Sequence, residues 1–262
     1  MIIDGKKLAA KLEKELVPEM HGRKLTLAVI SVGSDPVSLR YINKKKQIGE
    51  RLGITVIVHV FDAAISEENL ATEVMRISED RTVNGMIVQL PLPKHIATER
   101  ITARIPSEKD ADALGLYPRV LPPVVLAVRE ICREENISLH GKHIVIVGKG
   151  KLVGKPVAEW VRKEGAFVEI VDRSTKEPDE IFKKADIIVS GAGVPSLITP
   201  DKIKEGVILF DAATSEMSGK LVGDIDPACA DKAAFYTPVP GGIGPLTVVL
   251  LFKNLIELTH GD

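Results

Sequence analysis

Short apolar segments alternate with segments of helical periodicity along most of the chain. The apolar segments are rich in Val, Ile and Leu, which is typical of strands buried on both faces of a sheet. Strands that alternate with helices predict parallel sheets with right-handed crossovers, and therefore an α/β fold. We expect strands at 25–32, 54–61, 86–90, 144–147, 167–171, 187–190 and 207–211, and helices at 35–52, 66–79, 124–135, 156–163, 177–184 and 246–259.

The segment 104–123 interrupts this alternation. It is rich in proline and contains Asp110, Asp112 and Gly115, a composition typical of a functional loop and of a domain boundary. A chain of 262 residues is long enough for two domains. We expect an N-terminal α/β domain over 1–118 completed by the C-terminal helix (243–262), a linking helix over 119–137, a second α/β domain over 138–240, and long helices at 124–135 and 246–259 that link the two.

Composition narrows the class of protein. The chain carries 35 Lys and Arg against 36 Asp and Glu, so its balanced charge does not favour nucleic acid or an anionic membrane as a partner. The longest apolar runs, such as Leu246–Phe252, are much shorter than the roughly 20 residues that span a bilayer. The two cysteines suggest neither a disulfide framework nor a metal site. We therefore expect a cytoplasmic protein without a metal.

The second predicted domain begins with a strand, a glycine-rich loop and a helix, in the sequence IVIVGKGKLVGKPVAEW. Gly148, Gly150 and Gly154 are spaced one residue more widely than the common dinucleotide-binding pattern. Gly148 would permit a tight turn, and Gly150 would let the backbone approach a pyrophosphate at the helix N-terminus. The loop after the third strand of this domain would pass the nicotinamide. The expected cofactor-binding residues of the two loops are Gly148, Gly150, Val153, Gly154, Gly193 and Pro195.

The second strand of this domain ends at Asp172, where a ribose-binding group is expected. An aspartate there would accept hydrogen bonds from the ribose hydroxyls and favour NAD. Arg173 and Ser174 follow at once, and Lys149 lies in the glycine loop, so these three residues would instead hold the 2′-phosphate of NADP. Both cofactors remain open on the residues alone.

The first domain carries a second group of candidate residues. Tyr41 and Lys45 are four residues apart and share one face of a predicted helix. Gln89 lies at the carboxyl end of an apolar strand, where ligands of open α/β sheets bind, and Asp112 lies in the loop PSEKDADALG. Burial would lower the pKa of a lysine, and a glutamine would hold its amine without adding charge. Such a pair would activate water or transfer protons near neutral pH.

Five segments of the chain resemble the bifunctional methylenetetrahydrofolate dehydrogenase/methenyltetrahydrofolate cyclohydrolase family. They follow the family's order over nearly the whole chain. The most specific is TPVPGGIGPLT, and the least specific is the glycine loop. The segments are VGSDPVSLRYINKKKQIGERLGI, GMIVQLPLP, PSEKDADALG, IVIVGKGKLVGKP and TPVPGGIGPLT.

The resemblance implies a fold, an activity and a set of roles. The fold would be an N-terminal α/β catalytic domain and a Rossmann-type doubly wound parallel sheet. Tyr41 would stack on the folate, Lys45 would be the main catalytic group, and Gln89 would adjust its amine. Asp112 would bind the pterin ring. The implied substrate-binding residues are Tyr41, Gln89, Leu90, Pro91, Asp112, Pro240, Gly241 and Gly242.

The implied chemistry has two steps. NADP⁺ takes a hydride from 5,10-methylenetetrahydrofolate, and water then converts the methenyl product to 10-formyltetrahydrofolate. The family usually uses NADP and sometimes NAD, and it is usually a homodimer through the cofactor domain. The resemblance favours NADP here, with Lys149, Arg173 and Ser174 as ligands of its phosphate and Asp172 turned outward.

Several residues depart from the family pattern. Ala113 and Ala213 each stand where the family has glycine, and Asp172 stands where it usually has histidine. The segment 122–127 also differs, while Tyr41, Lys45, Gln89 and Asp112 are all retained. Two other interpretations therefore stay open: a dehydrogenase for a small acid or amino acid with a catalytic lysine, and a folate- or nucleotide-binding protein without activity.

Overall fold

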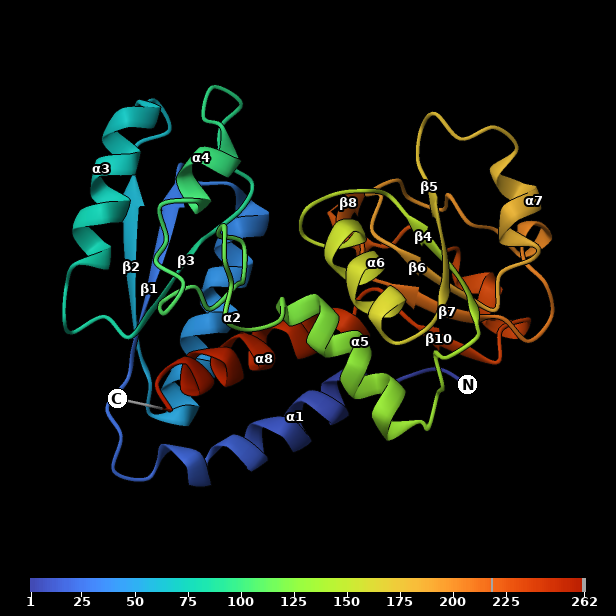
Figure 1. Ribbon diagram of the computed structural model, residues 1–262, viewed down its shortest axis with the longest axis horizontal. Helices are drawn as coiled ribbons and strands as arrows, with labels where there is room; N and C mark the ends of the chain where they lie inside the picture. Colours follow the sequence, from blue (N-terminus) through green and yellow to red (C-terminus); the bar gives the residue numbers. More distant parts are fainter. Residues whose placement is uncertain (218, 261–262) are drawn as a thin grey trace. The chain divides into compact units, whose positions relative to one another are not determined.

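The computed structural model describes residues 1–217 and 219–260. The chain forms two compact units, one of residues 1–10 and 124–247 and the other of residues 11–123 and 248–262. Each contains a parallel sheet flanked by helices (Figure 1). The prediction of an α/β fold with two domains is therefore confirmed. In this division the change from one unit to the other falls at the start of helix α5 (Pro123–Glu134). The domain boundaries expected from the sequence remain a prediction.

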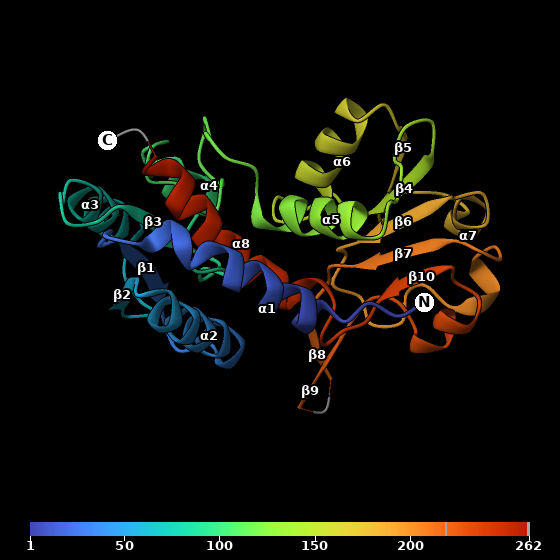
Figure 2. The same cartoon turned by 90° about the horizontal axis from the view of Figure 1, so that it is seen from below.

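The unit of residues 11–123 has a sheet of three strands in the order β2-β1-β3. Its central strand β1 (Thr26–Val32) pairs in parallel with β2 (Thr55–Phe61) and β3 (Gly85–Val88). Because successive side chains point to opposite faces, Ala28 and Ile30 pack against α3 (Glu67–Ser78), while α2 (Pro36–Leu52) lies on the other side of the sheet (Figure 2). The chain leaves β1 towards one edge and returns to the other with β3, so the loops after these strands meet at a switch point.

Helix α2 has the boundaries that its sequence predicts. The Asp35 side chain accepts a hydrogen bond of 2.7 Å from the backbone N–H of Ser38, which caps the helix N-terminus. Pro36 occupies the first turn, where a backbone N–H would have no partner. Gly53 ends the helix with a φ of 72°. These caps fix where α2 begins and ends.

The other unit has a sheet of five parallel strands in the order β10-β7-β6-β4-β5. The chain passes from β4 (His143–Val147) to β5 (Phe167–Val171) on one side and then crosses to β6 (Ile187–Ser190) on the other. This is a doubly wound arrangement with its switch point between β4 and β6. The remaining strands of the sheet are β7 (Ile208–Asp211) and β10 (Phe235–Thr237).

Three short strands have no counterpart among the expected elements. They are β10 and the antiparallel pair β8 (Ser215–Met217) and β9 (Lys220–Val222). Each has only three residues, too few for an apolar pattern to be read. Two further differences are boundaries: β3 ends at Val88, so Gln89 follows the strand, and helix α7 (Pro178–Phe182) is shorter than expected.

The other elements of the described residues complete the two units. No helix among these residues combines the length and the apolar character that crossing a membrane requires. No group of three or more His, Cys, Asp or Glu side chains in residues 1–217 and 219–260 is placed to hold a metal ion. The remaining elements are α1 (Gly5–Leu16), η1 (Pro18–Met20), α4 (Thr98–Thr102), α6 (Gly154–Lys163), η2 (Pro200–Lys202), η3 (Pro227–Asp231) and α8 (Ile243–Leu258).

Candidate active site

Lys45 is a buried lysine on the inner face of α2. Only 8% of its surface is exposed, and its neighbours on the same helix face, Ile42 and Ile48, are buried as well. Its Nζ atom donates a hydrogen bond of 2.8 Å to Oε1 of Gln89. Burial holds the pKa of Lys45 below its usual value, and the opposing charge of Asp112 limits that effect. The amine is therefore closer to its neutral form near physiological pH than a surface lysine would be.

Gln89 is oriented by its own neighbourhood. It follows β3, and its backbone N–H still donates to the carbonyl of Ile30 at 2.8 Å. Its side-chain Nε2 donates to the carbonyl of Leu90 at 2.9 Å, which leaves Oε1 directed at Lys45. The same Leu90 carbonyl accepts from the hydroxyl of Ser38 at 3.3 Å. The segment after β3 is thus hydrogen-bonded to α2 at both Ser38 and Lys45. The Leu90–Pro91 peptide that follows is cis.

Asp112 completes the group as a carboxyl that is readily protonated. Burial raises the pKa of Asp112 to about 6, with a smaller rise from Asp110, while the charge of Lys45 opposes the rise. Desolvation acts on Lys45 and Asp112 in opposite directions, since it favours the neutral form of each. Burial thus lowers the pKa of the Lys45 amine and raises that of the Asp112 carboxyl, while the charge of each partner opposes the shift of the other.

Asp110 was not expected in the site and supports the Asp112 loop from within. It is fully buried, and it accepts hydrogen bonds from the backbone N–H groups of Leu114 (3.3 Å) and Gly115 (2.7 Å). Ala113, which directly precedes Leu114, has a φ of 56°, in the left-handed region that favours glycine. The departure at Ala113 thus retains a backbone conformation suited to glycine. The close spacing of Asp110 and Asp112 in one loop was the only signal in the sequence.

Tyr41 lies one turn before Lys45 and is partly exposed. Its ring centroid is 5.9 Å from Nζ of Lys45 and 5.3 Å from Nζ of Lys44, which sequence reasoning did not select. An aromatic face beside a cation stabilises the charged amine, and an exposed face is open to stacking with a planar ligand. The structure therefore brings Tyr41, Lys45, Gln89 and Asp112 together in one unit.

Asn254, on helix α8, is a second residue that sequence reasoning missed. Its side chain is fully buried, and Nδ2 donates at 2.9 Å to the carbonyls of Ala111 and of Leu121. It therefore fixes the backbone next to Asp112 and the end of the loop 104–123. An asparagine within an apolar helix was the available signal, because a buried amide needs partners.

The glycine loop after β4 forms a cradle that excludes larger residues. Gly148 has a φ of 93°, and a Cβ there would lie 3.0 Å from the carbonyl oxygen of Gly191. A Cβ on Gly154 would lie 1.9 Å from the carbonyl of Gly148, and one on Gly191 would collide with Val153. These close approaches join the loops after β4 and β6 at the switch point. Gly150 has open space around it, so no contact within the chain requires glycine there.

The predicted ribose-binding group takes part in an ion pair. Nζ of Lys149 lies 2.6 Å from the Asp172 carboxylate, which also accepts from the backbone N–H (2.8 Å) and hydroxyl (2.6 Å) of Ser174. The hydrogen bond from Lys149 holds the pKa of Asp172 well below its usual range. Arg173 is exposed. Thus two of the three residues expected to hold a phosphate, Lys149 and Ser174, instead contact the carboxylate of Asp172.

The remaining predicted residues belong to the unit of residues 1–10 and 124–247. Gly193, with a φ of 70°, and Pro195 lie in the loop after β6. Pro240, Gly241 and Gly242 connect β10 to α8, and a Cβ on Gly242 would lie 2.7 Å from the carbonyl of Pro238. Their expected role towards a folate stays a prediction.

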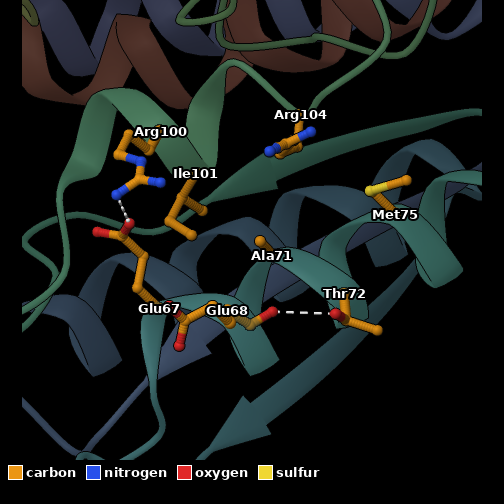
Figure 3. Close-up of a pocket in the computed structure, with 8 residues that line it drawn as sticks. All are labelled: Glu67, Glu68, Ala71, Thr72, Met75, Arg100, Ile101 and Arg104. Carbon is orange, nitrogen blue, oxygen red and sulfur yellow. Dashed lines mark hydrogen bonds and ion pairs between the residues drawn. The ribbon is translucent and has the colours of Figure 1, made fainter.

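A shallow pocket between α3 and α4 contains none of these residues (Figure 3). Its volume is about 200 Å³, and the ion pair of Glu67 with Arg100 (2.7 Å) crosses one end of it. The candidate residues therefore form two separate groups, the group around Lys45 in one unit and the glycine cradle in the other.

Comparisons with known proteins assign the family. Residues 3–112 match the catalytic domain of tetrahydrofolate dehydrogenase/cyclohydrolase, and residues 122–261 match its NAD(P)-binding domain. The bifunctional protein FolD of Nautilia profundicola is 38% identical, with 98% of this chain and 96% of that protein covered.

Solved structures agree with this assignment. The bifunctional enzyme FolD of Campylobacter jejuni superposes with a TM-score of 0.92 at 35% identity, covering 98% of both chains. The Trypanosoma brucei enzyme, solved with NADP cofactor and an inhibitor, gives 0.92 at 33% identity, covering 98% of this chain and 96% of that one. The resemblance found in the sequence is thus confirmed, and the chain belongs to the tetrahydrofolate dehydrogenase/cyclohydrolase family.

Proposed function

We propose that this protein is a bifunctional methylenetetrahydrofolate dehydrogenase and methenyltetrahydrofolate cyclohydrolase of one-carbon metabolism that uses NADP. The observation that carries the proposal is the hydrogen bond between the buried amine of Lys45 and Gln89, beside an Asp112 carboxyl with a raised pKa. Family membership supplies the substrate class, and this group supplies the proton chemistry that a cyclohydrolase needs.

Lys45 is the proposed base for the hydrolytic step. Its neutral amine takes a proton from water as the oxygen bonds to the methenyl carbon, and this proton passes to the ring nitrogen as the carbon–nitrogen bond breaks. The new hydroxyl group loses its proton to solvent as the formyl C=O forms, so that one proton is released overall. Gln89 keeps the amine in place, because its oxygen accepts from Lys45 while its Nε2 donates to the carbonyl of Leu90. Asp112 binds the pterin, and its raised pKa lets it bind as a donor or as an acceptor.

The glycine cradle fits a dinucleotide. Because Gly148, Gly154 and Gly191 carry no side chains, a ligand can approach the backbone at the N-terminus of α6, where a pyrophosphate is favoured. The bound cofactor supplies the hydride acceptor for the oxidation of 5,10-methylenetetrahydrofolate. Lys149, Arg173 and Ser174 are the proposed ligands of its 2′-phosphate. The ion pair of Lys149 with Asp172 favours NAD as the alternative cofactor.

The two activities are tested separately with purified protein. NADPH absorbance should rise with methylenetetrahydrofolate and NADP⁺, and methenyltetrahydrofolate should be hydrolysed faster than in buffer. Lys45→Met should abolish the hydrolysis while folate still binds, as measured by calorimetry. No turnover with either cofactor would instead favour a binding protein without activity, and full cyclohydrolase activity of Lys45→Met would exclude Lys45 as the base.

The protein is also proposed to be a homodimer through its nucleotide-binding unit. Strand β5 is an edge strand of the sheet, and it exposes 70% of Phe167 and 36% of Ile170. An exposed apolar edge strand is available to pair with a second copy. Light scattering should give twice the chain mass for the native protein and a monomer for Phe167→Lys. A monomeric native protein would refute the dimer. The cytoplasmic location expected from the sequence stays a prediction, which cell fractionation tests.

A further inference from the structure

A buried carboxylate lies beneath the loop that follows β6. Asp224 is fully buried, and its side-chain carboxylate accepts hydrogen bonds from this loop and from the end of the strand before it. Its Oδ2 accepts from the backbone N–H of Ala192 at 2.7 Å and of Gly193 at 3.2 Å, and its Oδ1 accepts from that of Val194 at 2.7 Å. The hydroxyl of Ser190 donates to Oδ2 at 2.7 Å.

These contacts determine how the peptides of the loop are turned. In a trans peptide the C=O group points away from the N–H group. Since the N–H groups of residues 192–194 point at Asp224, the carbonyls of Gly191, Ala192 and Gly193 turn the other way. The Gly191 carbonyl lies 3.0 Å from where a Cβ of Gly148 would stand, which places it against the glycine cradle. The loop therefore presents acceptors at the switch point.

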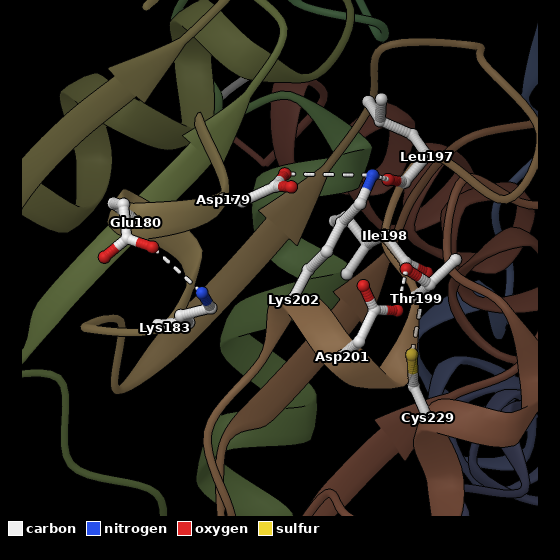
Figure 4. A network of polar contacts seen from close by, with 9 residues as sticks. All are labelled: Asp179, Glu180, Lys183, Leu197, Ile198, Thr199, Asp201, Lys202 and Cys229. Carbon is white, nitrogen blue, oxygen red and sulfur yellow. Dashed lines mark hydrogen bonds and ion pairs between the residues drawn. The ribbon is translucent and has the colours of Figure 1, made fainter. Parts of the chain in front are cut away.

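The backbone at Asp224 is also fixed by hydrogen bonds. The backbone N–H of Ile198 donates to the carbonyl of Asp224 at 3.0 Å, and Ile198 pairs with Ile225 in an isolated bridge. Further polar contacts hold the segment 197–202: Nζ of Lys202 donates to the carbonyl of Leu197 within the segment at 2.9 Å and pairs with Asp179 on α7 at 3.7 Å (Figure 4). The second buried carboxylate, Asp211, accepts from the backbone N–H groups of Asp224 and Ile225 at 3.3 and 2.9 Å.

We propose that Asp224 is a positioning residue for the cofactor: it sets the conformation of the loop 191–194, so that the outward carbonyls accept hydrogen bonds from donors of the bound dinucleotide. This inference rests on the proposed function. Four donors converge on one carboxylate, and three of them are consecutive backbone N–H groups, so Asp224 sets the orientation of three successive peptides. A buried carboxylate is costly unless it is hydrogen-bonded, and these donors satisfy it.

Asp224→Asn separates positioning from general stability. The variant keeps the shape but replaces one acceptor oxygen with an amide donor, so that at least one loop N–H faces another donor. We expect the Kd of NADP⁺, measured by calorimetry, to rise at least tenfold and the dehydrogenase kcat to fall. Cyclohydrolase activity, measured with methenyltetrahydrofolate and no cofactor, should stay within twofold, because Lys45, Gln89 and Asp112 belong to the other unit.

A matched control is Asp186→Asn. Asp186 also accepts from a strand backbone, that of His143 at 2.9 Å, but it lies before β6 and not after it. Its substitution should leave the Kd of NADP⁺ within twofold. An unchanged Kd in a folded Asp224→Asn protein would overturn the proposal. A native protein that binds neither NADP⁺ nor NAD⁺ would refute the proposed function instead.

Hydrogen exchange tests the same geometry without a variant, which matters if Asp224→Asn does not fold. In the native protein without cofactor, the amides of Ala192, Gly193 and Val194 should exchange at least tenfold more slowly than unbonded loop amides. Exchange of these three amides at the rate of open loops would overturn the proposal.

Discussion

Replacing Gln89 by glutamate tests the proton chemistry of Lys45 most directly. The two side chains have the same shape, so the substitution places a carboxylate oxygen where Oε1 now accepts from Nζ at 2.8 Å. The Coulomb attraction at that distance is about 6 kcal/mol at an effective dielectric constant of about 20. Gln89 is only half-buried, and solvent screening reduces this to about 3 kcal/mol. The ammonium form of Lys45 is stabilised by that amount.

The assay is the pH profile of the cyclohydrolase, with the uncatalysed hydrolysis subtracted at each pH. In the proposed mechanism activity requires the neutral amine, so it rises with pH as Lys45 loses its proton. Because about 1.4 kcal/mol corresponds to one pH unit, the midpoint of this rise should move about two units towards alkaline pH in Gln89→Glu. Below the native midpoint the rate should fall about a hundredfold.

Gln89→Met provides the control of opposite sign. It keeps the length of the side chain and removes the acceptor, which withdraws about 1.5–3 kcal/mol of hydrogen bonding from the ammonium form. The midpoint should therefore move towards acid pH. Both variants should bind folate, and their unfolding in urea should be measured to exclude a general loss of structure. Midpoints that coincide with that of the native protein in both variants would refute Lys45 as the titrating base.

Three further predictions follow from other parts of the molecule. Ala113→Gly should raise the free energy of unfolding in urea by up to about 1 kcal/mol, because a φ of 56° costs an alanine about 1–2 kcal/mol and a glycine little; a loss of stability would contradict the strain argument. Asp172→Ser should lower the Kd of NADP⁺ about tenfold while that of NAD⁺ rises, since it frees Lys149 and removes the like-charge repulsion between Asp172 and a 2′-phosphate; calorimetry with both cofactors decides. The pKa of Asp112 is raised to about 6 by folding, so the native state binds more protons than the unfolded state and Asp112 makes stability fall as the pH rises from about 4 to 6; urea titrations should show a smaller fall in Asp112→Asn, and an identical pH dependence would contradict the raised pKa.

The fold was predictable where the pattern of the sequence is local. The run Leu25–Val32 is apolar at nearly every position, and β1 is buried on both faces in the centre of its sheet. The Asp35–Pro36 start and the Gly53 end of α2 are capping signals that need no tertiary information. The strands β8, β9 and β10 could not be found in this way, because three residues define no period and their pairing depends on distant segments.

The site was predictable only in part, for the same reason. The four-residue spacing of Tyr41 and Lys45 predicts a shared helix face, but not whether that face is buried. Burial of Lys45 follows from the packing of α2 on the sheet, and the orientation of Gln89 follows from a hydrogen bond to the Leu90 carbonyl. Asp224 is about thirty residues from the N–H groups that it accepts from, so no pattern in the sequence connects them.

The distribution of the chemistry between the two units has a consequence for mutational data. The groups proposed to handle protons, Lys45, Gln89 and Asp112, belong to one unit, and the glycine cradle with Asp224 belongs to the other. Substitutions of Lys45, Gln89 or Asp112 should therefore change the cyclohydrolase without changing the Kd of the cofactor. Substitutions in the loops after β4 and β6 should do the reverse. A residue whose substitution changes both activities at an unchanged cofactor Kd must act on the folate, because both reactions share that substrate. We expect Asp112 to be such a residue, since it lies near Lys45.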